Sequence, residues 1–270
     1  MAEDSKVAIF GAGVMGEALL SGLMRGGIPT DQVAITERRP DRADAIRARH
    51  GVAVMSNIEA ARWADTLVLV VKPQDMAAVL AEIAPEVRKG SLVMSLAAGI
   101  TCRTIEEGLP AGHPVVRVMP NTPALVDEGM SALAAGASCD PEHLAEAARL
   151  MSSVGKVLEV PEGYLDAVTA ISGSGPAYIF YVVEAMIEAG VLLGLPRALA
   201  NELVVQTLVG AATMLRETGE HPTVLRENVS SPAGTTVAAV RQLDEHKVRA
   251  AFVSAMEAAR NRSRELAAGS

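Results

Sequence analysis

The chain has 270 residues, a formal net charge of −8 at pH 7 and a sequence pI near 5.2. This acidity argues against a nucleic-acid partner, because phosphate backbones are bound by basic surfaces that the sequence does not offer. Half of the residues are apolar and only 3% are aromatic, so we expect a core of aliphatic side chains and methionine. A chain of this length more often forms two domains than one.

The cysteines and the N-terminal residues indicate where the protein works. Cys102 and Cys139 are the only cysteines, and they lie far apart without metal-ligand spacing, which is typical of reduced thiols. The segment MAEDSKVAIF has charged residues where a signal peptide needs an apolar core. No uninterrupted apolar run of about 18 residues follows it. We therefore expect a cytoplasmic protein with no metal site and no membrane contact.

Two kinds of pattern divide the chain. In the first half, helix-length segments separate five short apolar runs: KVAIF, QVAIT, DTLVLVV, SLVMSLA and PVVRVM. This alternation predicts a mainly parallel sheet with helices on both faces. From about Tyr164 onward, apolar segments with helical spacing are interrupted at GLPRA, TGEHP and VSSPAG. We expect a doubly wound α/β domain over residues 1–162 and an all-helical domain over residues 163–270.

Gly11, Gly13 and Gly16 form the motif G-x-G-x-x-G directly after a predicted strand and at the start of a predicted helix. The glycines allow a tight turn, a close approach of the backbone to a pyrophosphate and close helix–strand contact, while the helix N-terminus favours negative charge. An ordinary strand-to-helix turn would also fit the bare motif. Its position at the start of the chain favours a Rossmann-type dinucleotide-binding domain.

The residues after the second predicted strand, ITERRP, bear on the choice of cofactor. Glu37 lies about 20 residues past the last glycine, where an acidic residue binds the ribose 2′-hydroxyl of NAD. Arg38 and Arg39 favour a 2′-phosphate, which arginine binds through charge-assisted hydrogen bonds. At least one of them could instead be a solvated loop residue. We expect NADPH as the cofactor, with NADH tolerated.

Two further loops follow predicted strands, at the sheet edge where open α/β folds bind ligands. Lys72 and Pro73 end one strand, so the lysine can lie over the cofactor. Asn121 stands between two prolines and can hydrogen-bond a nicotinamide ribose or carboxamide. The alternatives are a solvated lysine and an asparagine that only forms a turn. Their common place on the sheet favours the binding roles.

The helical half carries more apolar surface than a small domain can bury. The segments YIFYVVEAMIEAGVLLG and LVVQTLVGAATMLRE are apolar around much of their circumference. Contact with another subunit would cover them, so we expect a homo-oligomer.

The segment NVSSPAGTTVAAVRQL is a polar interruption between apolar helices. Pro232 ends any preceding helix, Gly234 permits an unusual turn, and Thr235 and Thr236 begin a new helix. Unpaired N–H groups, a favourable helix dipole and several hydroxyls would together bind an anion. A serine or threonine that only caps the helix is the alternative. Four hydroxyl residues around one glycine exceed what a cap needs.

These motifs resemble the pyrroline-5-carboxylate reductase family. The family's C-terminal signature is similar to VSSPAGTTVAAV, and its other landmarks resemble FGAGVMGEAL, VVKPQ, SLAAGIT, VRVMPNTP and DAVTAISGSGPAYIF. Together these segments span nearly the whole chain in the expected order and are highly specific. Ala233 stands where many relatives have glycine, which affects the geometry of that loop.

The resemblance implies reduction of 1-pyrroline-5-carboxylate to L-proline by NADPH, the last step of proline biosynthesis. It implies that Ser231, Gly234, Thr235 and Thr236 bind the substrate, with the Thr236 hydroxyl at the ring nitrogen. Contacts to the cofactor are implied at Gly11, Ala12, Gly13, Val14, Met15, Gly16, Arg38, Arg39, Asn57, Val70, Lys72, Pro73, Ala98, Asn121 and Asn228. Homodimers with interlocked helices are also implied, as are higher assemblies of dimers such as a decamer.

Two other functions fit part of the sequence. β-Hydroxyacid dehydrogenases share the two-domain plan and resemble the chain at SGSGPAYIF, but they carry a lysine on the next helix. This chain has no lysine between Lys156 and Lys247. A non-catalytic dinucleotide-sensing protein would use the N-terminal domain alone and would leave the hydroxyl-rich segment unexplained.

Overall fold

The computed structural model describes residues 5–268, which form two compact units. One comprises the described residues up to Ser174 together with those from Ala259 onward, and the other is Gly175–Ala258. The division expected between residues 162 and 163 stays a prediction. Residues 163–174 and the end of the last helix belong to the same compact unit as the sheet.

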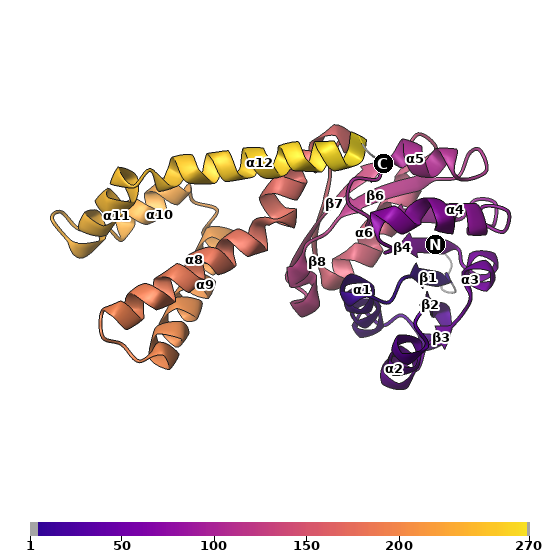
Figure 1. Cartoon of the computed structure of the whole chain (residues 1–270), viewed down its shortest axis with the longest axis horizontal. Helices are drawn as coiled ribbons and strands as arrows, with labels where there is room; N and C mark the ends of the chain where they lie inside the picture. The colour runs from indigo at the N-terminus through magenta and orange to yellow at the C-terminus, as the bar shows by residue number, and fades with distance from the viewer. Residues whose placement is uncertain (1–4, 269–270) are drawn as a thin grey trace. The chain divides into compact units, whose positions relative to one another are not determined.

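The first unit is built on an eight-stranded sheet with helices on both faces (Figure 1). Its strands are β1 (Val7–Phe10), β2 (Val33–Thr36), β3 (Ala53–Val54), β4 (Thr66–Leu69), β5 (Leu92–Ser95), β6 (Val115–Met119), β7 (Gly129–Ala135) and β8 (Gly155–Glu159). Its helices include α1 (Val14–Arg25), α2 (Pro40–His50), α3 (Asn57–Trp63), α4 (Met76–Ile83), α5 (Cys102–Glu107), α6 (Pro141–Met151) and α7 (Leu165–Val168).

The strand order is β3-β2-β1-β4-β5-β6-β7-β8, and β1 to β6 run parallel. The five apolar runs form β1, β2, β4, β5 and β6, so the expected doubly wound α/β fold is confirmed. Three strands were not predicted: β3, β7 and β8. Strand β7 pairs antiparallel with β6, and β8 pairs parallel with β7, so the sheet is mixed at this end.

Side chains of β1 alternate between two apolar cores. Val7 and Ile9 pack with residues of α1, α2 and α6, whereas Ala8 and Phe10 pack with residues of α3, α4 and α5. All four residues are fully buried. Because helices cover both faces of the sheet, the central strands are apolar at every position, which is why they were recognisable in the sequence.

Helix α1 begins in close contact with the end of β1. Gly11 follows the strand with φ of +103°, and its N–H donates to the Thr36 carbonyl at 3.0 Å. A Cβ at Gly16 would lie 2.1 Å from the Gly11 carbonyl oxygen, whereas a Cβ at Gly13 would meet no atom within 4 Å. Gly16 therefore has a packing requirement that Gly13 does not share.

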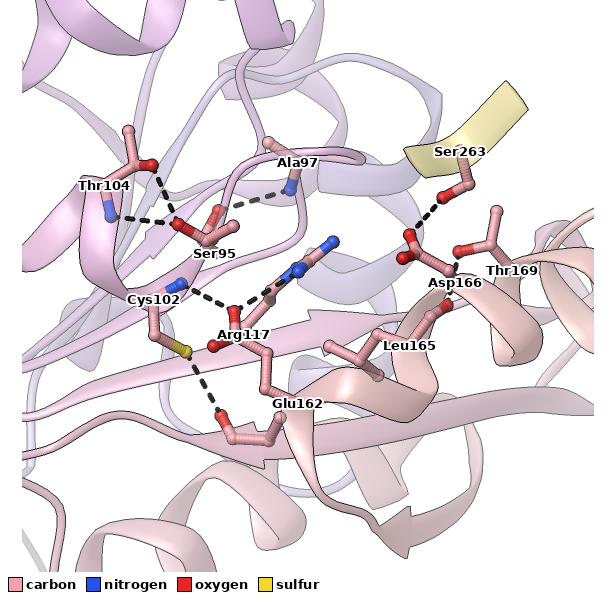
Figure 2. A network of polar contacts seen from close by, with 12 residues as sticks. Ser95, Ala97, Cys102, Thr104, Arg117, Glu162, Leu165, Asp166, Thr169 and Ser263 are labelled. Atoms are coloured by element: carbon pink, nitrogen blue, oxygen red, sulfur yellow. Dashed lines mark hydrogen bonds and ion pairs between the residues drawn. The ribbon is translucent and has the colours of Figure 1, made fainter. Parts of the chain in front are cut away.

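Glu162 ties the chain that follows β8 to two other elements (Figure 2). Its Oε1 accepts a hydrogen bond from the Cys102 N–H at 2.7 Å and lies 3.2 Å from Nη1 of Arg117 on β6. The Arg117 side chain is only 8% exposed, so this carboxylate compensates a buried charge. Burial, followed by the charge and hydrogen bond of Glu162, raises the pKa of the Cys102 thiol to about 12. The thiol is therefore protonated at neutral pH and unreactive.

The second unit is helical, as expected. It contains α8 (Gly175–Leu192), α9 (Arg197–Thr218), α10 (Pro222–Asn228), α11 (Thr235–Glu245) and the part of α12 (Val248–Ala268) that precedes Ala259. The interruptions expected at GLPRA, TGEHP and VSSPAG all separate helices. A further interruption at Lys247, between α11 and α12, was not predicted.

Helices α8 and α9 expose large apolar side chains. Phe180 is 66% exposed and Leu192 is 88% exposed, and several apolar residues of α9 are also accessible. Within the described residues, the helical spans Glu162–Leu192 and Arg197–Thr218 are long and apolar enough to cross a membrane, judged by length and composition alone. Apolar residues of a subunit interface are likewise exposed when one chain is considered without its partner.

The hydroxyl-rich segment forms the turn between α10 and α11. The Gly234 N–H donates to the Ser231 carbonyl at 2.9 Å, which closes the turn. Ala233 adopts a left-handed backbone conformation with φ of 57°. Because a Cβ is unfavourable in this conformation, the structure explains why glycine suits this position.

Replacing Gly16 by alanine should lower the free energy of unfolding by about 1–3 kcal/mol, since the new methyl group overlaps the Gly11 carbonyl. Urea denaturation followed by circular dichroism measures this. Gly13→Ala is the matched control in the same loop and should cost less than about 1 kcal/mol, because nothing opposes its methyl group. Equal losses in the two variants would contradict the packing argument.

Replacing Ala233 by glycine should raise the free energy of unfolding by about 0.5–1 kcal/mol. Relief of the left-handed conformation, about 1–2 kcal/mol, exceeds the entropic cost of glycine, about 0.5–1 kcal/mol. Ala238→Gly, inside α11, is the control and should destabilise by about 1 kcal/mol. The explanation fails if urea denaturation shows both variants to be destabilised alike.

Candidate functional site

The glycine-rich loop directs unpaired backbone groups toward an open cleft. Helix α1 begins after Gly13, and no side chain caps it. The N–H groups of the first helical turn have no partner within the helix, so they and the helix dipole favour an anion. A Cβ at Gly13, which lines the cleft, would project into open space. The loop therefore fits the pyrophosphate of a dinucleotide.

Arg42 holds this loop from the side of α2. Its Nε donates to the Ala12 carbonyl at 2.8 Å, and its guanidinium pairs with Glu17 of α1. Glu17 also contacts Arg49 at 2.7 Å and His50 at 3.1 Å. Burial opposes ionisation of Glu17, but these hydrogen bonds and positive charges outweigh it and lower the pKa of the carboxyl. Neither Arg42 nor Glu17 was predicted from the sequence to have a role in this site.

The cleft has a volume of about 420 Å³ and lies at the carboxyl ends of β1, β2 and β4. Seven of the residues predicted to contact a cofactor line it: Gly11, Gly13, Arg38, Arg39, Asn57, Val70 and Lys72. Glu37 and Asp75 also line it. The cleft thus brings together residues that follow separate strands, which parallel strands achieve by ending at one edge of a sheet.

Two ion pairs lie in this cleft. Nη2 of Arg38 is 2.9 Å from Oδ2 of Asp75, which ends the short 3-10 helix η2 (Pro73–Asp75). Oε1 of Glu37 accepts a hydrogen bond from the Arg39 N–H at 3.0 Å and lies 3.4 Å from Nε of Arg39. The Glu37 side chain is 11% exposed, whereas Arg38 is 78% exposed. Asp75 was not identified from the sequence, since its partner lies 37 positions away.

The other predicted cofactor contacts of the first unit lie near the same sheet edge but do not line the cleft. Ala12, Val14, Met15 and Gly16 belong to the glycine-rich loop and the first turn of α1, Pro73 follows Lys72, and Ala98 is exposed in the turn after β5. Asn121 follows β6, where its side chain accepts from the Met130 N–H at 2.8 Å and donates to the Ser172 carbonyl at 3.1 Å. One N–H and one lone pair remain for a ligand.

The hydroxyl-rich segment of the second unit starts helix α11 without a side-chain cap. Gly234 is the N-cap residue, and Thr235 and Thr236 are the first two residues of the helix. Capping was the alternative explanation for these hydroxyls, and the structure rules it out for α11. Ser231 and Thr235 are exposed, and Thr236 is half-buried. Asn228 is exposed at the end of α10.

Residues 5–268 contain no candidate metal centre. In that part of the chain, no three His, Cys, Asp or Glu side chains are grouped so that they could hold a metal ion.

Comparison with known families matches both halves of the chain. Residues 162–266 match the model for pyrroline-5-carboxylate reductase dimerisation. Residues 6–99 match the model for NADP oxidoreductase, coenzyme F420-dependent.

Similar proteins that cover nearly the whole chain include several pyrroline-5-carboxylate reductases. The pyrroline-5-carboxylate reductase of Corynebacterium melassecola is 50% identical over 264 residues, covering 96% of this chain and 98% of that protein. The structure of a pyrroline-5-carboxylate reductase from Coxiella burnetii has a TM-score of 0.92 and 37% identity, covering 97% of this chain and 98% of that one. The Plasmodium falciparum pyrroline carboxylate reductase, solved with NADP bound, has a TM-score of 0.89 and 30% identity, covering 99% of this chain and 100% of that one. Since half of its residues are shared with a relative over nearly its whole length, the chain belongs to the pyrroline-5-carboxylate reductase family.

Proposed function

We propose that the chain reduces 1-pyrroline-5-carboxylate to L-proline with NADPH, the last step of proline biosynthesis, and that it also accepts NADH. The observation that carries this proposal is the uncapped start of α11 at Gly234, where hydroxyl residues surround free backbone N–H groups. Membership of the reductase family favours this reaction over oxidation of a β-hydroxyacid and over a dinucleotide sensor.

The first unit binds the cofactor. The loop from Gly11 to Gly16 holds the pyrophosphate, Arg38 and Arg39 hold the 2′-phosphate, and Lys72 lies beside the phosphates. The remaining contacts come from Asn57, Val70, Pro73, Ala98 and Asn121. The NADP found in the Plasmodium falciparum relative supports this assignment. When bound, NADPH supplies the hydride.

The turn before α11 binds the substrate. Backbone N–H groups at the start of the helix, with the Ser231 and Thr235 hydroxyls, bind the carboxylate, because a helix N-terminus favours an anion. The Thr236 hydroxyl accepts a hydrogen bond from the protonated imine nitrogen and orients C5 toward the hydride donor. A cyclic imine that enters protonated is already a strong hydride acceptor, so the protein needs no strong acid here.

The helical unit forms a homodimer through α8 and α9, and dimers can build a decamer in the cytoplasm. The match to a dimerisation model and the exposed apolar side chains support the dimer. Glu184 and Glu188 lie within α8. A charged side chain is costly at the centre of a membrane-spanning helix, whereas it can remain at the wet rim of a protein interface. A second copy of the chain therefore fits these helices better than lipid.

Replacing Thr236 by alanine should lower kcat about 10- to 100-fold, since a hydrogen bond to a charged group contributes about 1.5–3 kcal/mol. Oxidation of NADPH at 340 nm with racemic 1-pyrroline-5-carboxylate measures this. The dissociation constant of NADPH should be unchanged, and Thr236→Ser should retain most of the activity because it keeps the hydroxyl. Unaltered turnover of the alanine variant at saturating imine would refute the role of Thr236.

Replacing Phe180 by glutamate should convert the dimer into monomers, because it places a charge on an apolar surface of α8. Sedimentation velocity measures the mass of the particle. Leu158→Glu changes an exposed leucine, 58% accessible, on edge strand β8 of the first unit and should leave the assembly intact. If the Phe180→Glu variant remained dimeric, α8 would be excluded from the interface.

A further inference from the structure

The cleft proposed for the cofactor contains carboxylates as well as cations. Lys72, Arg38 and Arg39 line it, and so do Glu37 and Asp75. Each arginine is paired with one of the two carboxylates. A 2′-phosphate that binds here therefore meets guanidinium groups that are already partly neutralised.

Asp75 and Glu37 differ in what they can do for a ligand. Glu37 directly follows β2, and an acidic residue at this place binds a ribose hydroxyl. Asp75 lies on the loop after β4 and contacts Arg38. Its carboxylate therefore affects a ligand through Arg38 and through its own charge, and both effects are largest for a ligand that carries a 2′-phosphate.

The two partners of this pair also differ in freedom. The Asp75 side chain is 28% exposed, and its backbone N–H donates to the Lys72 carbonyl at 2.9 Å within η2. The Arg38 side chain is 78% exposed, so less of the protein restrains it. Asp75 is thus the fixed partner, and Arg38 is drawn toward it. A phosphate must compete with the carboxylate for Arg38 and must approach a second negative charge.

We propose that Asp75 is a specificity-determining residue, which holds Arg38 and weakens binding of the 2′-phosphate so that NADPH and NADH are both accepted. This inference rests on the proposed function, which assigns the 2′-phosphate to Arg38 and Arg39. An exposed ion pair changes an affinity by a few-fold and not by orders of magnitude. Asp75 therefore shifts the preference between the cofactors without excluding either.

Binding of two small probes tests Asp75 without turnover. Adenosine 2′,5′-bisphosphate carries the 2′-phosphate, and 5′-AMP lacks it. By calorimetry at low ionic strength, Asp75→Asn should bind the bisphosphate about three- to tenfold more tightly than the unmodified chain, with the affinity for 5′-AMP changed less than about twofold. Asp75→Ser should behave in the same way, since it also removes the charge.

Asp44→Asn is the matched control. Asp44 forms an exposed ion pair with Arg47 at 2.7 Å on α2 and does not line the cleft. Its replacement by asparagine changes the net charge by the same amount as Asp75→Asn. It should leave the affinities for both probes unchanged. Unchanged bisphosphate binding by Asp75→Asn, or an equal gain for 5′-AMP, would overturn the assignment of Asp75.

A second pair of variants tests whether Asp75 acts through Arg38. In an Arg38→Ala background, Asp75→Asn should no longer raise the affinity for the bisphosphate substantially. If the affinity still rose by the full amount, the proposed coupling between Asp75 and Arg38 would be overturned. The ratio of KM for NADH to KM for NADPH should rise in Asp75→Asn. If the unmodified chain bound neither probe and oxidised neither cofactor with the imine, the proposed function itself would fail. Normal binding and turnover with no effect of Asp75→Asn would refute only this inference.

Discussion

The approach of helix α1 to the end of β1 is the constraint on which the cleft depends. No side chain larger than hydrogen fits at Gly16 beside the Gly11 carbonyl, so the helix starts directly at the sheet edge. Its unpaired N–H groups therefore face the cleft formed after β1, β2 and β4. Arg42 then holds the Ala12 carbonyl, which ties the loop to α2 and to the residues that follow β2.

Helix starts in this chain differ in whether a side chain caps them. Ser56, Thr101 and Asp140 cap α3, α5 and α6 with side-chain oxygens, and these helices pack on the sheet. Helices α1 and α11 begin at Gly13 and Gly234, and no side chain caps them, which is also true of α2, α4, α7 and α9. In a capped helix start, a side-chain oxygen accepts hydrogen bonds from N–H groups of the first turn. In an uncapped start, these N–H groups can donate to a bound anion. The same device thus serves the pyrophosphate and the carboxylate in the proposed reaction.

The sequence predicted those features that depend on local pattern. Central strands covered on both faces are continuously apolar, and the glycine-rich loop has a fixed spacing, so both were recognisable. Strand β7 escaped prediction because GMSALAA consists mostly of small residues without clear alternation. The Arg38–Asp75 pair and the contacts of Asn121 with Met130 and Ser172 join positions far apart in the chain. Such contacts depend on how the strands are ordered, which no local pattern records.

The segment RRPDR shows why residue type alone does not assign a role. Arg38 and Arg42 lie four positions apart. The Arg42 side chain is 23% exposed and bonded to a backbone carbonyl and to Glu17, so moving it would leave polar groups unsatisfied. Arg38 is 78% exposed and has one carboxylate partner, so it can turn toward a ligand at little cost. Burial therefore separates the arginine that holds the loop from the one that can bind the cofactor, and that difference exists only once α2 has packed against α1.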